Sequence, residues 1–134
     1  LAAAAPAAAH SERVEHRGAA YDVTYHPHVS AAARTVGVHA GTRMSQQRCR
    51  WTITVEVDRQ IRQPGGGEAL TRRLAGERRF SGSTAGACER DGRTIKQAQA
   101  ERATAITAHV LALASTDRPA LLAEIDAARA LALN

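Results

Sequence analysis

Large apolar side chains are scarce in this chain of 134 residues. Alanine supplies 30 of its hydrophobic residues, and its aromatic residues number only four. A chain of this length fits one domain, which can bury about two-thirds of the surface that its unfolded form exposes. We therefore expect the core to depend on the few large side chains, above all Tyr21, Tyr25, Trp51 and Phe80.

Long hydrophobic runs are also missing. No apolar run approaches the roughly 18 residues that a transmembrane helix needs, so the sequence predicts no membrane span. Residues 1–9 are nearly all alanine with one proline, which resembles the small-residue cleavage region of a secretory signal peptide. We assign residues 1–15 to a signal-peptide remnant or an Ala/Pro linker, and residues 16–134 to a single domain. The expected location is the periplasm or the outside of the cell.

Cysteine occurs only twice, as Cys49 and Cys88. Their spacing matches no zinc motif, and an exported chain favours a disulfide. The bond would close a loop of about 40 residues and stabilise the fold by about 4 kcal/mol. Two buried free thiols in a cytosolic protein are the alternative.

Lysine is nearly absent, because Lys96 stands beside 17 arginines in a chain of net charge +5. Arginine suits phosphate and carboxylate recognition, but a GC-rich genome also favours alanine and arginine. Acidic residues are interspersed, so we predict a mixed, solvated surface. On the two predicted strands that flank residues 64–67, arginines and acids should neutralise one another: Arg50, Arg73 and Arg79 with Glu56, Asp58 and Glu77. The excess positive charge should then lie elsewhere, around Arg13, Arg17, Arg34, Arg43, Arg90 and Arg93.

Apolar residues at alternate positions predict strands. The strongest pattern covers residues 48–58, where five residues share one face: Cys49, Trp51, Ile53, Val55 and Val57. Weaker alternation predicts strands at residues 21–26 and 36–40, with a connector at residues 29–33. The glycine-rich residues 64–67 predict a loop. A hairpin around it would place Trp51 opposite Phe80, Ile61 opposite Leu70 and Asp58 opposite Arg73, with a bulge near Ala75 and Gly76.

Helical periodicity follows the strands. Thr94 and Gln97 fit a capping box for a helix over residues 94–114. Residues 115–117 break this helix and cap a second one, and the short turn favours an antiparallel helix pair. Strands first and helices last predict an α+β fold: a four-stranded antiparallel sheet followed by a C-terminal antiparallel helix pair packed on one face.

Two groups of side chains are candidate sites. His26, His28 and His39 fall on the polar side of their strands and together could bind zinc or copper. Unligated surface histidines with no cofactor are the preferred interpretation. Gln99, Arg102 and His109 lie along the first helix and could line a polar pocket. The alternative is that these three residues form the edge of an apolar stripe and extend their polar tips into water.

Signatures of established activities are absent. The chain has no H-E-x-x-H, no G-x-S-x-G and no P-loop. The aromatic residues belong to inward positions, which argues against a nucleic-acid-binding sheet. We therefore expect a non-catalytic exported domain that binds an unknown envelope component, with no oligomeric state specified. The alternative is a small hydrolase or metal-dependent enzyme that uses the His26, His28 and His39 face or His109.

Overall fold

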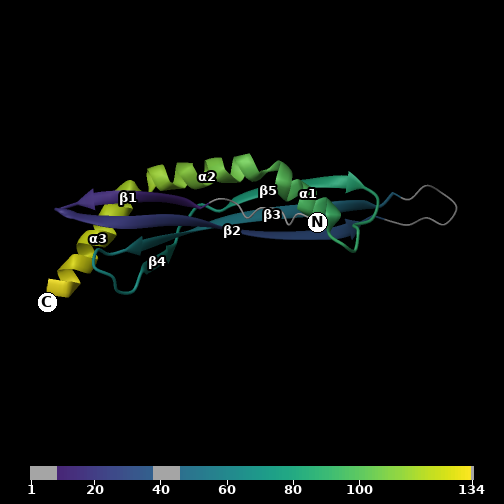
Figure 1. The fold of residues 1–134 in the computed structure, drawn as a ribbon. Helices are drawn as coiled ribbons and strands as arrows, with labels where there is room; N and C mark the ends of the chain where they lie inside the picture. The colour runs from purple at the N-terminus through teal and green to yellow at the C-terminus, as the bar shows by residue number, and fades with distance from the viewer. Residues whose placement is uncertain (1–8, 38–45, 134) are drawn as a thin grey trace.

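Five antiparallel strands form one sheet, and three helices follow them in the chain (Figure 1). The computed structural model describes residues 9–37 and 46–133. The sheet order is β1-β2-β3-β4, and β5 pairs with β3 beyond β4. The α+β class is thus as predicted, with one strand and one helix more than expected. The strands are β1 (His10–His16), β2 (Ala19–Val36), β3 (Arg48–Arg62), β4 (Leu70–Arg73) and β5 (Arg78–Ala85); the helices are α1 (Arg93–Glu101), α2 (Ala103–Thr116) and α3 (Arg118–Leu133).

β1 occupies part of the segment assigned to a linker. It pairs with β2 along its whole length, and Val14 is its one buried residue. Because its other inward positions carry histidine or glutamate, the period-two pattern was hidden. Arg17 and Gly18 close the hairpin with φ angles of 50° and 79°, the left-handed region that such two-residue turns require. Residues 10–15 therefore belong to the sheet rather than to a linker.

β2 is one long strand where the sequence predicted two strands and a connector. β3 pairs with it continuously, from Arg62 opposite Asp22 to Arg48 opposite Val36. This pairing gives every residue of the expected connector, residues 29–33, a partner in the sheet in spite of its alanines. The connector prediction is therefore wrong. The remainder of the second predicted strand, from residue 38 on, lies outside the described residues.

The predicted hairpin register is correct on one side of a register shift. Asp58 lies opposite Arg73 and Ile61 opposite Leu70, as expected. The prediction that Trp51 lies opposite Phe80 is wrong, because the chain between β4 and β5 adds two residues to the register. Gly82 lies opposite Trp51 as a result, and Phe80 lies opposite Ile53. The interruption includes Gly76, at φ 104°, where the sequence predicted a bulge.

The first predicted helix is divided into α1 and α2 at Arg102, whose φ and ψ are −103° and 6°. The capping box at Thr94 is not formed. Gly92 is the N-cap, without a side-chain hydrogen bond, and the Thr94 hydroxyl donates to Glu89 instead. No helix among the described residues is long and apolar enough to cross a membrane.

α3 begins after a one-residue break at Asp117, as residues 115–117 predicted. The backbone at Asp117 is itself in the right-handed helical region. α3 lies at an angle to α2, over one end of the sheet (Figure 1). This detail differs from the expected antiparallel pair. The Asp126 carboxylate of α3 accepts a hydrogen bond from Arg17 Nε at 2.8 Å and lies 2.9 Å from His16 Nε2. α3 is thereby tied to the β1–β2 turn.

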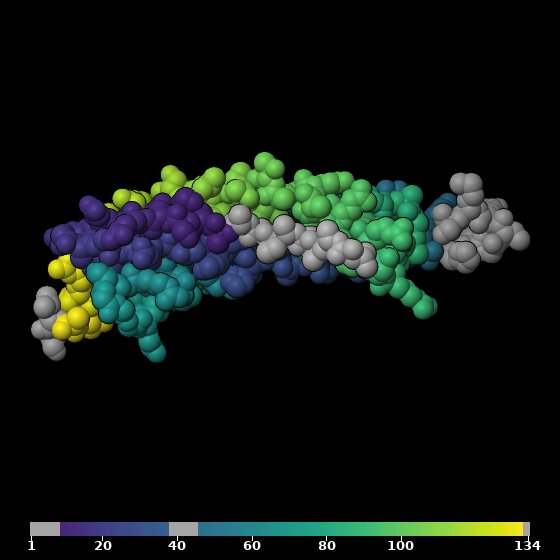
Figure 2. Space-filling view, in the orientation of Figure 1, coloured from purple at the N-terminus to yellow at the C-terminus, as the bar shows by residue number. Residues whose placement is uncertain are grey.

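One face of the sheet, which we call the inner face, packs against the helices (Figure 2). Its first cluster joins the β1 end of the sheet to α2 and α3, and includes Tyr25, Val57, Val110 and Leu121. Its second joins Trp51 and Ile53 to α1 and α2. The opposite face, which we call the outer face, carries the even-numbered residues of β2 and β3.

A disulfide joins Cys49 of β3 to Cys88 in the segment before α1, as the sequence predicted. Their Cα atoms are 4.7 Å apart. The bond connects β3, two residues before Trp51 of the second cluster, to the chain that enters the helices.

Candidate functional site

The predicted histidine face is partly present. His26 and His28 lie on β2, and both belong to the outer face. His28 Nε2 lies 2.7 Å from Asp58 Oδ2, whereas His26 Nε2 lies 3.4 Å from Gln60 Oε1. His39 lies outside the described residues. Within residues 9–37 and 46–133, no three histidine, cysteine, aspartate or glutamate side chains are grouped to hold a metal ion.

The predicted polar group on the first helix does not converge. The Arg102 guanidinium lies 4.5 Å from the centre of the Trp51 ring and 6.0 Å from that of Phe80. His109 Nε2 lies 2.9 Å from the Gly76 carbonyl oxygen. Both side chains, like Gln99, are only partly buried. Arg102 and His109 thus contact different parts of the sheet.

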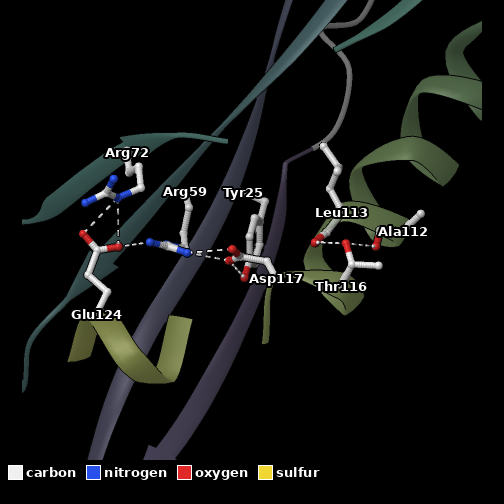
Figure 3. A network of polar contacts seen from close by, with 8 residues as sticks. All are labelled: Tyr25, Arg59, Arg72, Ala112, Leu113, Thr116, Asp117 and Glu124. Carbon is white, nitrogen blue, oxygen red and sulfur yellow. Dashed lines mark hydrogen bonds and ion pairs between the residues drawn. The ribbon is translucent and has the colours of Figure 1, made fainter. Parts of the chain in front are cut away.

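A buried arginine that the sequence analysis overlooked is the centre of the main polar cluster. Arg59 is 1% exposed, although β3 otherwise places only apolar residues at its inward positions. Its Nη1 donates to both carboxylate oxygens of Asp117 at 2.7 Å, and its Nη2 pairs with Glu124 (Figure 3). The strand alternation alone would have marked it, since Arg59 falls between Val57 and Ile61 on the same face.

Two side chains complete this cluster. The Tyr25 hydroxyl donates to Asp117 Oδ2 at 2.9 Å, and Arg72 Nε lies 3.3 Å from both oxygens of Glu124. Burial, and then the hydrogen bond to Asp117, raise the pKa of Tyr25 well above its usual value. Tyr25 therefore stays a neutral donor. Arg59 Nε is the one buried side-chain polar atom without a partner in the described part of the chain.

The contacts of this cluster connect the sheet to the helices, and they do not form a reactive centre. Asp117 separates α2 from α3, and Glu124 lies on α3, so Arg59 joins both to the middle of the sheet. A neutral phenol and a doubly paired guanidinium offer neither an activated nucleophile nor a base. We interpret the cluster as a polar clamp that positions α3.

A small hollow of about 330 Å³ opens beside this clamp, between β1 and the end of α2. His10 stacks on Tyr25 with ring centres 6.2 Å apart, and its Nε2 lies 3.1 Å from Glu12. Arg118 also pairs with Glu12, at 3.4 Å. The acid of this hollow is thus neutralised by its own neighbours.

The middle of the outer face is neutralised, as predicted. Arg73 pairs with Asp58 and Glu56, and Arg79 pairs with Glu77. Beyond this middle part the prediction fails for Arg50. Arg50 lies directly opposite Arg34 of β2, and neither side chain contacts a carboxylate within the described ranges.

Arg48 continues this basic region. It lies two residues from Arg50 on the same side of β3 and donates to the Ser83 hydroxyl, at 3.1 and 3.2 Å. All three arginines are exposed. We call this region, Arg34, Arg48 and Arg50, the arginine end. An open hollow of about 630 Å³ lies over it, lined among others by Arg34, Arg50, Thr52, Ser81 and Ser83.

Comparison with known proteins adds no relative: no protein family, no curated protein and no solved structure matches this chain.

Proposed function

We propose that this chain is an exported, non-catalytic domain that binds another component of the cell envelope through its outer face. The observation that carries the proposal is the asymmetry of the sheet. The helices bury the inner face, while the outer face extends along β2 and β3 with polar side chains at nearly every position. A broad polar surface of this kind suits the docking of a large partner. Small molecules instead bind in enclosed, largely apolar pockets.

Two features support export. The Cys49–Cys88 disulfide is the form of cysteine expected in an oxidising compartment. Residues 1–9, nearly all alanine with one proline, have the small-residue composition of a signal-peptide cleavage region. An enzyme that uses the histidines is the weaker candidate, because the His28 side chain beside Asp58 is exposed and His109 contacts a backbone carbonyl oxygen.

Co-sedimentation with insoluble bacterial cell-envelope fragments tests the proposal. The variant Ser30→Tyr places a bulky side chain in the middle of the outer face, opposite Thr54, at a position where tyrosine suits a strand. We expect it to sediment less with the fragments than the unmodified chain does.

The matched control is Ala105→Tyr, which adds the same side chain at an exposed position of α2. It should sediment like the unmodified chain. Equal sedimentation of all three proteins, or a loss with Ala105→Tyr alone, would show that the outer face is not the binding surface.

A further inference from the structure

The arginine end breaks a rule that the rest of the outer face obeys. Like charges directly opposite each other on neighbouring strands destabilise a sheet, and Arg34 and Arg50 form such a pair. Elsewhere on the described part of this face, Arg73 and Arg79 each pair with a carboxylate, and Arg13 and Arg62 both lie opposite Asp22. A local arrangement that costs stability without a compensating contact is expected where a ligand supplies the compensation.

The geometry favours several charges on one ligand. Neighbouring strands are about 4.8 Å apart, and residues i and i+2 of a strand are about 6.6 Å apart, so three guanidinium groups project from a small area. Arg34 and Arg50 together present ten N–H donors, more than the two oxygens of one carboxylate can accept. Ser81, Ser83 and Thr52 add hydroxyl groups around the same hollow.

The outer face also excludes other classes of anion. Tyr21, Tyr25, Trp51 and Phe80 all belong to the inner face, and Trp51, which reaches the edge of the hollow, is only 7% exposed. Bases of single-stranded nucleic acids therefore find little exposed ring surface at the arginine end on which to stack. The large apolar side chain that lines the hollow, Trp51, is buried and so is not available to enter a lipid layer.

We infer that the arginine end binds a linear phosphate polymer of the envelope by its phosphate groups alone. This inference rests on the proposed function, because it names the chemistry of the partner that the outer face would bind. Arg34 and Arg50 bind successive phosphates, each through paired N–H donors, and the hydroxyl groups accept or donate at the remaining oxygens. Arg48, already bonded to Ser83, adds charge beside them.

Titration with long-chain inorganic polyphosphate, followed by calorimetry, tests the inference. Three neutralised phosphates predict a salt slope near −2, so affinity should fall about 20-fold between 50 and 200 mM salt. The double variant Arg34→Ser/Arg50→Ser should bind roughly 10- to 100-fold more weakly. Its thermal unfolding midpoint should be equal or higher, since a repulsion is removed.

The control is Arg13→Ser/Arg62→Ser, which changes the net charge equally at the opposite end of the outer face. It should lose less than about threefold in affinity, as expected of a distant, screened charge. Equal losses in the two double variants, or no binding by the unmodified chain, would overturn the inference. So would poly-L-glutamate, duplex DNA or anionic vesicles that bind as tightly as polyphosphate.

The two proposals can fail separately. If Ser30→Tyr abolishes sedimentation with envelope fragments but Arg34→Ser/Arg50→Ser leaves polyphosphate binding unchanged, the outer face binds a partner of other chemistry. If the arginine variant loses polyphosphate binding while Ser30→Tyr sediments normally, the phosphate site stands and the docking function falls.

Discussion

Two kinds of arginine serve opposite purposes in this molecule. Arg59 is buried and tolerated only because Asp117 and Glu124 both pair with it. Removing charges from water costs more than a single pairing returns, so such a cluster specifies an arrangement rather than adding much net stability. Arg34 and Arg50 are exposed, lack carboxylate partners in the described structure, and remain available to a ligand.

The clamp predicts a large effect of a small substitution. Asp117→Ala removes the carboxylate that Arg59 and Tyr25 share, and leaves the buried guanidinium with Glu124 alone. Because the backbone at Asp117 is right-handed helical, alanine fits there without strain. We expect a loss of about 3–5 kcal/mol in the free energy of unfolding, measured by urea titration. Asp126→Ala, which breaks a more exposed pair on α3, should cost much less; equal losses would contradict the clamp.

Tyr25 predicts a weakness at alkaline pH. Burial and the Asp117 hydrogen bond raise its pKa in the folded protein, so its contribution to stability is complete below the unfolded pKa of about 10. Above that pH the unfolded chain releases the proton first, and the free energy of unfolding falls by up to about 1.4 kcal/mol per pH unit. Urea titrations from pH 9 to 11 should show this fall in the unmodified chain but a shallower one in Tyr25→Phe. Parallel curves would refute the assignment.

At the scale of elements, the sequence predicted best where large side chains alternate. β3 was recognised because Trp51, Ile53 and Val55 recur at every second position, and their burial confirms the predicted face. β1 and the second half of β2 were missed because histidine, glutamate and alanine stand at their inward positions. Those segments are strands because β3 supplies the partner, which local pattern does not encode.

For the candidate sites, the sequence likewise predicted the face of a residue but not its distant partners. Alternation along β3 places Arg59 inward, but its partners lie 58 and more residues away and depend on how α3 docks. Arg34 lies opposite Arg50 because β2 is continuous. The sequence analysis predicted a connector at residues 29–33 instead, so it did not predict this pairing. Cys49 and Cys88 were paired correctly because only one pairing exists.

The register shift between β4 and β5 predicts a requirement for glycine at position 82. A Cβ there would lie 2.4 Å from Cζ2 of Trp51, so the buried indole would have to move. Gly82→Ala should therefore lower the free energy of unfolding by about 1–3 kcal/mol, although alanine is the better residue for most backbones. Ser81→Ala, one residue away on the outer face, is the control and should change stability little. If Gly82→Ala is neutral by urea titration, Trp51 does not lie against β5.

At the scale of the whole molecule, two core clusters hold one long sheet, and the disulfide secures the one with fewer buried residues. The first cluster has ten buried residues and is reinforced by the Arg59 clamp. The second has five, and Cys49 comes two residues before its first member, Trp51, on β3. The chain on the other side of the bond leads directly into α1, which covers this cluster through Ile95 and Ala98.

The double variant Cys49→Ala/Cys88→Ala tests how far the fold depends on that bond. The cysteines are 39 residues apart in sequence, so closing this loop contributes about 4 kcal/mol, a large part of the 5–15 kcal/mol typical of a whole domain. We expect the variant to lose about that amount in urea titration, and the reduced, unmodified chain to lose the same. Because the second cluster depends on the bond, Trp51 fluorescence should report unfolding at lower urea than far-ultraviolet circular dichroism does. Two titratable thiols in the denatured, unreduced protein, or coincident curves with no loss, would contradict this account.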